Sequence, residues 1–304
     1  MSGMDLADAR FPHAGVGDAF YESYYLTAYD PDSPRALWIR HTVWKAPGLA
    51  PVGSVWRTWF GLDGPRADKW STPDVAVGPL IRVGDALLTP EGATAPDWEI
   101  RWVGDDPPFA HLPLPLLYAA PLPRTKSVSL RPRVRYDGQV HVDGEAIDLD
   151  GWTGMVGHNW GSEHAERWMW LRGAGPDWLV DMVLGRLRVG PVTTPWMANG
   201  VLERAGHRTR LGGLGRRVQV VDREDGCRLQ VSGLDIEVDA PAGSLSGWVY
   251  SDPAGGSHHV LHSSVARMVV RTAGATLECA HAATYEIGRR ELPMHVPMLP
   301  FPDP

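Results

Sequence analysis

The sequence predicts an all-β protein built from antiparallel β-barrels, with few short helices. Short runs rich in β-branched and aromatic residues recur about every 8–12 residues and end at turn residues, as expected for many short strands. The chain contains 34 Gly and 27 Pro, and no long segment has the 3.6-residue period of a capped helix. Closure into barrels removes exposed sheet edges, and a barrel of about eight strands can hold one small ligand.

The first strands follow a leader, residues 1–17, that shows no clear period and is expected to be loose or docked. Residues 21–29 and 36–45 are rich in aromatic and β-branched side chains, and the turn-forming segment 30–34 separates them. This pattern predicts a hairpin, and residues 55–60 are expected to form the third strand.

Residues 98–103 alternate strictly, so Trp98, Ile100 and Trp102 are expected to share the buried face of a strand. The segment 112–123 is interrupted by prolines and is therefore predicted to be neither a helix nor a central strand. We expect it to be a packed connection that contributes to the rim of a pocket.

Strand-like spacing continues along the rest of the chain. Residues 127–136 and 139–142 are expected to form a hairpin around Asp137-Gly138, and Asp143-Gly144 marks another turn. Further strands are expected at 178–184, 218–221, 228–231, 235–238, 247–250 and 264–270. Short helices near 162–167 or 280–285 are left open.

The length of 304 residues favours two domains. We predict an N-terminal β-barrel over residues 1–145 and a C-terminal β-barrel over residues 146–304 that carries the central stretch described below.

Composition excludes several classes of function. A net charge of −7 and the lack of a long Lys/Arg run argue against nucleic-acid binding. No apolar run reaches the roughly 20 residues of a membrane-spanning helix, and the N-terminal residues show no secretory signal. We therefore expect a cytoplasmic protein without an integral membrane segment. The oligomeric state is left open.

No cofactor or metal site is predicted. Cys227 and Cys279 lie outside any metal-ligand pattern and are expected to be buried thiols. His258 and His262 are four residues apart, but their surroundings indicate a strand rather than a zinc-binding helix. Motifs of serine hydrolases, phosphate loops, dinucleotide sites and zinc proteases are missing.

The stretch 157–170 combines ionisable and aromatic residues more densely than any other part of the chain. An acid among indoles has its pKa raised by desolvation, and indole faces attract developing positive charge. The alternative is a polar belt in which Glu166 and Arg167 are solvated and the Trp residues belong to the core. The candidate catalytic residues are His158, Trp160, Glu163 and, downstream, Asp181.

The candidate substrate-binding residues are His164, Asn159, Trp168, Trp170 and Trp38. Asp181 lies within the apolar run 178–184, where an inward carboxylate would need a partner or a purpose. An outward, solvated Asp181 is the other possibility. The chain has 14 Trp against 8 Tyr and 5 Phe, which favours a broad apolar cavity.

Three features resemble the carotenoid hydratase (hydroxyneurosporene synthase) superfamily of tandem lipocalin-like proteins, which includes tocopherol-cyclase-like and fungal Diels–Alderase-like members. These are the strand pair 22–26 with 36–40, the ending 283–288, and the motif Gly157-His158-Asn159-Trp160-Gly161. The motif is similar to the superfamily's Asp-His-x-Trp-Gly signature and is the most specific of the three. The resemblance covers nearly the whole chain.

The resemblance implies two lipocalin-like barrels with an apolar pocket in or between them, and chemistry without a metal or nucleotide. The superfamily's implicated His and Trp fall on His158 and Trp160. Its Tyr-x-Asp pair falls on Leu179 and Asp181, so the Tyr is missing, and Gly157 stands where the signature has an acid. Members that close rings by orienting the substrate do not need this set.

We therefore expect a hydratase or cyclase acting on an apolar isoprenoid or polyketide-like substrate, with His158 and either Asp181 or Glu163 supplying the proton. A non-catalytic carrier of a lipid or pigment would need the pocket but no proton donor. A scaffold or interaction module would have no closed apolar cavity.

Overall fold

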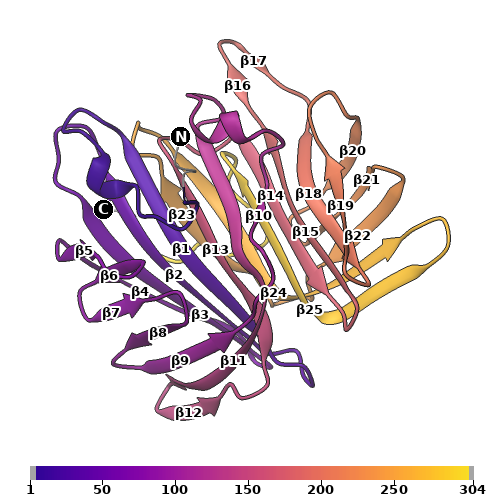
Figure 1. Cartoon of the computed structure of the whole chain (residues 1–304), viewed down its shortest axis with the longest axis horizontal. Helices are drawn as coiled ribbons and strands as arrows, with labels where there is room; N and C mark the ends of the chain where they lie inside the picture. Colours follow the sequence, from indigo (N-terminus) through magenta and orange to yellow (C-terminus); the bar gives the residue numbers. More distant parts are fainter. Residues whose placement is uncertain (1–4, 301–304) are drawn as a thin grey trace.

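The computed structural model describes residues 5–300, and antiparallel strands dominate it (Figure 1). The first sheet has the order β4-β3-β2-β1-β13-β11-β9-β8-β7-β6-β5, with β10 and β12 paired to β11. Its strands are β1 (Phe20–Tyr29), β2 (Ala36–Lys45), β3 (Val52–Gly61), β4 (Gly64–Thr72), β5 (Val75–Val77), β6 (Ile81–Val83), β7 (Ala86–Leu88), β8 (Gly92–Ala95), β9 (Trp98–Val103), β10 (Phe109–Ala110), β11 (Thr125–Val142), β12 (Glu145–Asp148) and β13 (Thr153–Gly161).

The second sheet has the order β19-β18-β15-β14-β25-β24-β22-β21-β20, with β23 paired to β24. Its strands are β14 (Arg167–Ala174), β15 (Trp178–Arg186), β18 (Met197–Arg204), β19 (His207–Gly212), β20 (Val218–Asp222), β21 (Gly226–Val231), β22 (Leu234–Asp239), β23 (Ser246–Ser251), β24 (Ser257–Arg271) and β25 (Thr276–Arg289). A separate hairpin joins β16 (Arg188–Val189) and β17 (Val192–Thr193).

Each large sheet curls around its own apolar core, which confirms the prediction of two antiparallel barrels. In the first core, Trp98, Ile100 and Trp102 are buried on one face of β9, as their alternation predicts. The described helices are two short 3-10 turns, η1 (Phe11–His13) and η2 (Pro115–Tyr118). No helix among the described residues is long and apolar enough to cross a membrane.

The leader is docked over its described part, and residues 1–4 lie outside the described residues. Leu6, Ala7 and Phe11 pack against the core of the first barrel. The carboxylate of Glu22 accepts hydrogen bonds from the backbone N–H groups of Arg10 and Phe11. The segment therefore adds apolar surface to this core.

The prediction of a hairpin around Asp137-Gly138 is wrong, because β11 continues through these two residues as one strand. Gly138 has φ 108°, and a Cβ there would lie 2.1 Å from the carbonyl oxygen of Glu99 on β9. The glycine thus permits a close approach between paired strands rather than a reversal. The turn at Asp143-Gly144 does join β11 to β12.

The change of sheet comes later in the chain than the boundary expected between residues 145 and 146. Strand β13 pairs with β1 and β11, so the motif at 157–161 belongs to the first sheet rather than to the C-terminal barrel. Strand β14 is the first strand of the second sheet. The reason is that β13 fills the gap between β1 and β11, which no local pattern reveals.

The two barrels lie side by side (Figure 1). Outward-facing side chains of both sheets pack between them. Trp38 of β2 stacks on Trp248 of β23 with ring centroids 5.1 Å apart. The hydroxyl groups of Tyr29 and Thr284 share a hydrogen bond of 2.6 Å across this contact. Both faces of β1, β2 and β13 are consequently buried.

Candidate active site

A cavity of about 680 Å³ lies between the two barrels. Its walls come from the outward faces of both sheets, and the segment 112–123 forms part of its edge, as predicted. Small-molecule sites in proteins commonly have volumes of roughly 300–1,000 Å³. The cavity is therefore large enough for a small apolar molecule.

The first barrel contributes alternate residues of β2 and β11 to this wall, together with Tyr25 of β1 and Asn159 of β13. On β2, Trp38 and Arg40 line the cavity, while Leu37, Ile39 and His41 point into the barrel. The alternation follows from the two-residue period of a strand.

Two aromatic rings of the wall lie over glycines of the neighbouring strand. Tyr25 is paired with Gly157, and a Cβ on that glycine would lie 2.3 Å from the Tyr25 ring. Trp168 is paired with Gly288, where a Cβ would lie 2.1 Å from the indole. Gly157 and Gly288 thus give the rings room to lie flat along the sheet.

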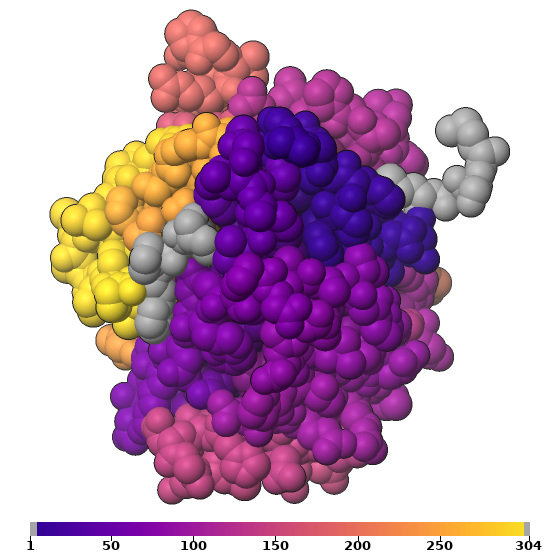
Figure 2. Space-filling view, turned by 90° about the vertical axis from the view of Figure 1, so that its left-hand side faces the viewer, coloured from indigo at the N-terminus to yellow at the C-terminus, as the bar shows by residue number. Residues whose placement is uncertain are grey.

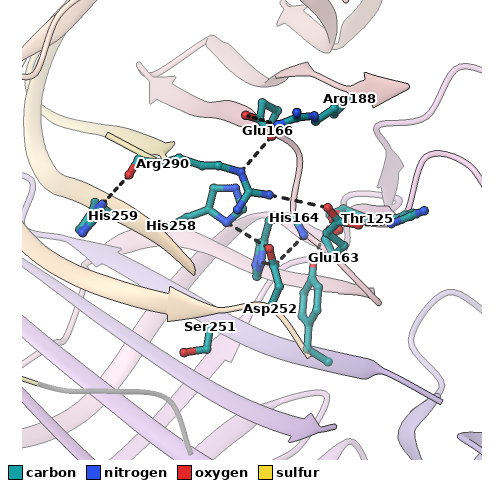
Figure 3. Close-up of polar contacts among 12 residues, drawn as sticks. Thr125, Glu163, His164, Glu166, Arg188, Ser251, Asp252, His258, His259 and Arg290 are labelled. Carbon is teal, nitrogen blue, oxygen red and sulfur yellow. Dashed lines mark hydrogen bonds and ion pairs between the residues drawn. The ribbon is translucent and has the colours of Figure 1, made fainter. Parts of the chain in front are cut away.

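A carboxylate links two imidazoles beside the cavity (Figure 3). Asp252 follows β23 and is buried, and its Oδ1 accepts hydrogen bonds from Nδ1 of His164 at 2.7 Å and from the His164 backbone N–H at 2.9 Å. Nδ1 of His258 on β24 lies 3.2 Å from Oδ2. His164 belongs to the loop between β13 and β14, and its ring lines the cavity.

The tautomer of His164 follows from these contacts. Because Nδ1 donates to Asp252, Nε2 carries the lone pair of the neutral ring, and it is buried with no hydrogen-bond partner among the described residues. Burial lowers the pKa of His164, although the hydrogen bond and charge of Asp252 act in the opposite direction. His164 is therefore a neutral base at neutral pH.

Asp252 remains ionised in this pair. Burial alone would raise the pKa of its carboxyl group, but hydrogen bonds from His164 and His258 outweigh it and hold the pKa well below the usual range. An ionised carboxylate on Nδ1 orients the ring and stabilises the imidazolium that forms when Nε2 takes a proton.

His164, Asp252 and His258 are also the residues that could hold a metal ion, since their ligand atoms lie within 4.8 Å of one another. Arg40 and Arg290 both interact electrostatically with this cluster, and a divalent ion would add positive charge beside two guanidinium groups.

A second polar group borders the cavity at His111. Its Nε2 is 3.2 Å from Oγ of Ser129, which donates a hydrogen bond to the buried carboxylate of Asp181. Burial lowers the pKa of His111, with the charge of Asp181 opposing. Asp181 is fully buried behind the residues that line the cavity rather than solvated. Its carboxylate also accepts a hydrogen bond of 3.1 Å from the indole N–H of Trp170.

Glu286 of β25 adds a carboxylate to the wall. Burial acts to raise its pKa, but the hydrogen bond and charge of His262 and the indole N–H of Trp168 bring the pKa below its ordinary value. His262 is therefore engaged by Glu286 and does not form a zinc pair with His258.

Some of the residues that line the cavity carry unpaired buried polar atoms. Within residues 5–300, buried side-chain atoms without a hydrogen-bond partner occur on five lining residues: Nε1 of Trp38, Nδ1 of His111, Oδ1 of Asn159, Nε2 of His164 and Oδ1 of Asn199. Most buried polar groups in proteins are hydrogen-bonded. These five atoms leave hydrogen-bonding capacity unused in residues that surround the cavity.

The predicted binding residues all lie at this cavity. Trp38, Asn159, His164, Trp168 and Trp170 line it.

The predicted catalytic residues lie elsewhere. His158 and Trp160 point into the first barrel, where Nδ1 of His158 donates to the carbonyl of Leu6 at 2.8 Å and Nε2 lies 2.7 Å from Glu22. Glu163 is part of the surface and pairs with Arg124 and Arg290. Asp181 does not line the cavity. Its carboxylate contacts the lining residues Trp170 directly and His111 through Ser129.

Sequence reasoning missed Asp252, His111, Arg40 and Glu286. Asp252 looks like an ordinary turn residue in Ser-Asp-Pro, and His111 precedes a Pro-rich segment. Glu286 had a signal, because it is a carboxylate within the apolar ending 283–288.

Comparison with known proteins gives relatives of undetermined function. No protein-family model matches the chain. An uncharacterized protein of Mycobacterium tuberculosis, present in two strains, is 29% identical over 160 residues, which are 49% of this chain and 48% of the relative. The chain thus matches about half the length of these curated relatives.

Solved structures share the fold over nearly the whole chain. CghA superposes with a TM-score of 0.59 at 14% identity, covering 95% of each chain. Kievitone hydratase from Nectria haematococca gives 0.57 at 11% identity, covering 94% of this chain and 92% of its own. A protein assigned as AttH from Nitrosomonas europaea gives 0.56 at 11% identity, covering 96% and 100%. The two barrels are therefore lipocalin-like.

Proposed function

We propose that this protein is a cofactor-independent hydratase or cyclase that acts on an apolar isoprenoid or polyketide-like molecule in the cavity between its barrels. The observation that carries the proposal is the imidazole of His164 in the lining of the cavity, with the carboxylate of Asp252 on its Nδ1. The fold is also that of a protein named a hydratase.

His164 acts as the general base. In a hydration, Nε2 takes a proton from water as the water oxygen bonds to one alkene carbon, and the imidazolium then returns the proton to the other carbon. The water O–H bond breaks, C–O and C–H bonds form, and the histidine ends neutral, so the step needs no further reactant. Asp252 stabilises the imidazolium in between.

The walls orient the substrate and balance its charge. Arg40 places a guanidinium in the wall, where it would stabilise an oxyanion that develops on a conjugated substrate. Trp38, Trp168 and Trp170 give the apolar chain a fixed path, and the same walls would hold a ring-closing conformation.

This assignment moves the proton-transfer role from His158 to His164. Neither His158 nor Trp160 lines the cavity, whereas His164 does. Asp181 is proposed as a positioning residue, because it holds the Trp170 indole and, through Ser129, His111.

Two variants test the base. His164→Ala and Asp252→Asn are incubated with a panel of polyenes and polyketide-like alkenes, chosen after native mass spectrometry of co-purifying molecules, and products are followed by mass and ring count. Turnover should fall about 100-fold or more in His164→Ala. The wild-type rate should fall on acidification only below pH ~6.5, because burial lowers the pKa of the base.

His207→Ala is the matched control, since His207 is exposed on β19 and does not line the cavity. Unchanged rates in both His164→Ala and Asp252→Asn would remove the base from the proposal. Wild-type protein that binds the molecules and returns every one unaltered would instead be a carrier of a lipid or pigment.

A further inference from the structure

We propose that the rim of the cavity docks on an anionic lipid bilayer, so that the substrate passes from the membrane into the cavity without crossing water. The inference rests on the proposed function only in taking the occupant of the cavity to be apolar.

Three segments form the rim: residues 112–124, 187–196 and 213–218, each of which contributes to the cavity wall. In Figures 1 and 2 the hairpin of β16 and β17 projects from the same end of the molecule as the segment with η2. The three segments are therefore gathered around one opening although they are far apart in the chain.

The rim exposes large apolar side chains that the barrels do not cover. They are Leu114 (41% exposed), Leu116 (65%), Leu122 (50%), Val189 (55%), Val192 (63%) and Leu214 (65%). Single exposed apolar residues are ordinary on a protein surface, but a group around the mouth of an apolar cavity marks an interaction site.

The charge of the rim has one sign. The three segments contain four arginines, Arg124, Arg188, Arg216 and Arg217, and no Asp, Glu or Lys, although the chain as a whole carries −7. Arg124 and Arg188 reach acids outside the rim, Glu163 and Glu166. Arg216 and Arg217 are exposed and form no ion pair within residues 5–300.

This combination fits a bilayer better than a folded partner. Apolar side chains enter the boundary between headgroups and acyl chains, while arginines bind lipid phosphates. The apolar residues are on separate loops rather than on one flat face, and a fluid surface can follow such a shape. A membrane is also the natural reservoir of an apolar substrate.

The test is vesicle flotation of the full-length protein without substrate. We expect binding to phosphatidylcholine vesicles that contain phosphatidylglycerol, much weaker binding to phosphatidylcholine alone, and weakening with salt. Arg216→Ala with Arg217→Ala should lower the partition coefficient roughly 30-fold, about 5-fold for each arginine. Leu116→Asp with Val192→Asp should also lose binding.

Two double variants serve as controls. Arg135→Ala with Arg204→Ala removes two exposed arginines of the barrels, and Val103→Asp with Val221→Asp changes exposed valines of β9 and β20. Both should float as the wild type does. Failure of the wild type to bind anionic vesicles, or equal losses in rim and control variants, would overturn the proposal. So would a dimer in solution that the rim variants dissociate, because the rim would then bind a second copy.

Failure of this inference can be told apart from failure of the proposed function. Leu116→Asp with Val192→Asp changes no cavity-lining residue, so turnover of a detergent-dispersed substrate should match the wild type. Turnover by a wild-type protein that does not bind vesicles would refute the membrane-docking proposal and leave the proposed function intact. Vesicle binding without turnover leaves the docking surface in place on a carrier.

Discussion

The imidazole of His158 is bonded through both ring nitrogens inside the first barrel. Glu22, its partner on β1, also accepts the backbone N–H groups of Arg10 and Phe11. The pair thus holds the leader over the core, and Tyr24 and Trp160 stack on the His158 ring. At this position the structure shows an anchor for the N-terminal segment.

His41 makes stability depend on pH. It is fully buried in the first barrel, neither ring nitrogen has a hydrogen-bond partner among the described residues, and burial lowers its pKa to about 4. Between pH 6.5 and about 4 the unfolded chain binds a proton that the folded protein does not. The free energy of unfolding should therefore decrease as the pH is lowered through this window, by roughly 3 kcal/mol in total.

His41→Met removes the titrating group while keeping an adaptable apolar side chain. Urea unfolding at pH 7 and pH 4.5 should show a smaller loss of stability in this variant than in the wild type. His207→Met, at an exposed site, should behave as the wild type. An identical loss of stability between pH 7 and pH 4.5 in His41→Met and the wild type would contradict this account.

At the scale of the strand, Gly157 and Gly288 explain why aromatic rings can form the cavity wall. Each glycine lies directly opposite an aromatic residue, Tyr25 or Trp168, and a Cβ would overlap the ring. The Asp that begins the Asp-His-x-Trp-Gly signature would not fit at position 157 with the Tyr25 ring in its present place. The departure from the signature is thus linked to the shape of this cavity.

Gly157→Ala should destabilise the protein by about 1–3 kcal/mol, because the added methyl group forces the Tyr25 ring off its position. In the Tyr25→Ala background the same change should cost much less, and denaturant unfolding of the double-mutant cycle measures the coupling. Gly274→Ala is the control, since a Cβ there meets nothing within 4 Å. Equal costs in both backgrounds would show that Tyr25 is not the cause.

At the scale of the whole molecule, the two barrels share an apolar contact. Trp38, Trp56 and Phe60 of the first barrel form one buried cluster with Trp248 and Tyr250 of the second. Arg210 of β19 also donates to the carbonyl groups of Ala110 and His111 in the first barrel. A large apolar contact of this kind couples the stability of two domains.

We therefore expect a single unfolding transition, with Trp fluorescence and far-UV circular dichroism coinciding in denaturant. Trp38 stacks on Trp248 at the contact between the barrels, so Trp248→Ala would leave a cavity there. The substitution should lower the free energy of unfolding by about 3–5 kcal/mol. Two separate transitions in the wild type would show that the barrels are stable independently.

Local sequence patterns determined the aromatic character of the cavity and many of the strands and turns, although not the course of β11 through Asp137-Gly138. The hairpin of β1 and β2 and the buried face of β9 follow from the two-residue period of a strand, which depends only on neighbouring residues. The same period separates His158 and Trp160 from Asn159. It cannot tell which face of β13 points into the barrel, because both faces are buried.

Only the tertiary structure decided that question, because the order of strands in the sheets sets which face meets the core and which meets the other barrel. It put Asn159 at the cavity and His158 in the barrel interior. It also brought Asp252 to His164 across 88 residues of sequence. A hydrogen bond between residues that distant depends on packing of whole sheets, and no local spacing encodes it.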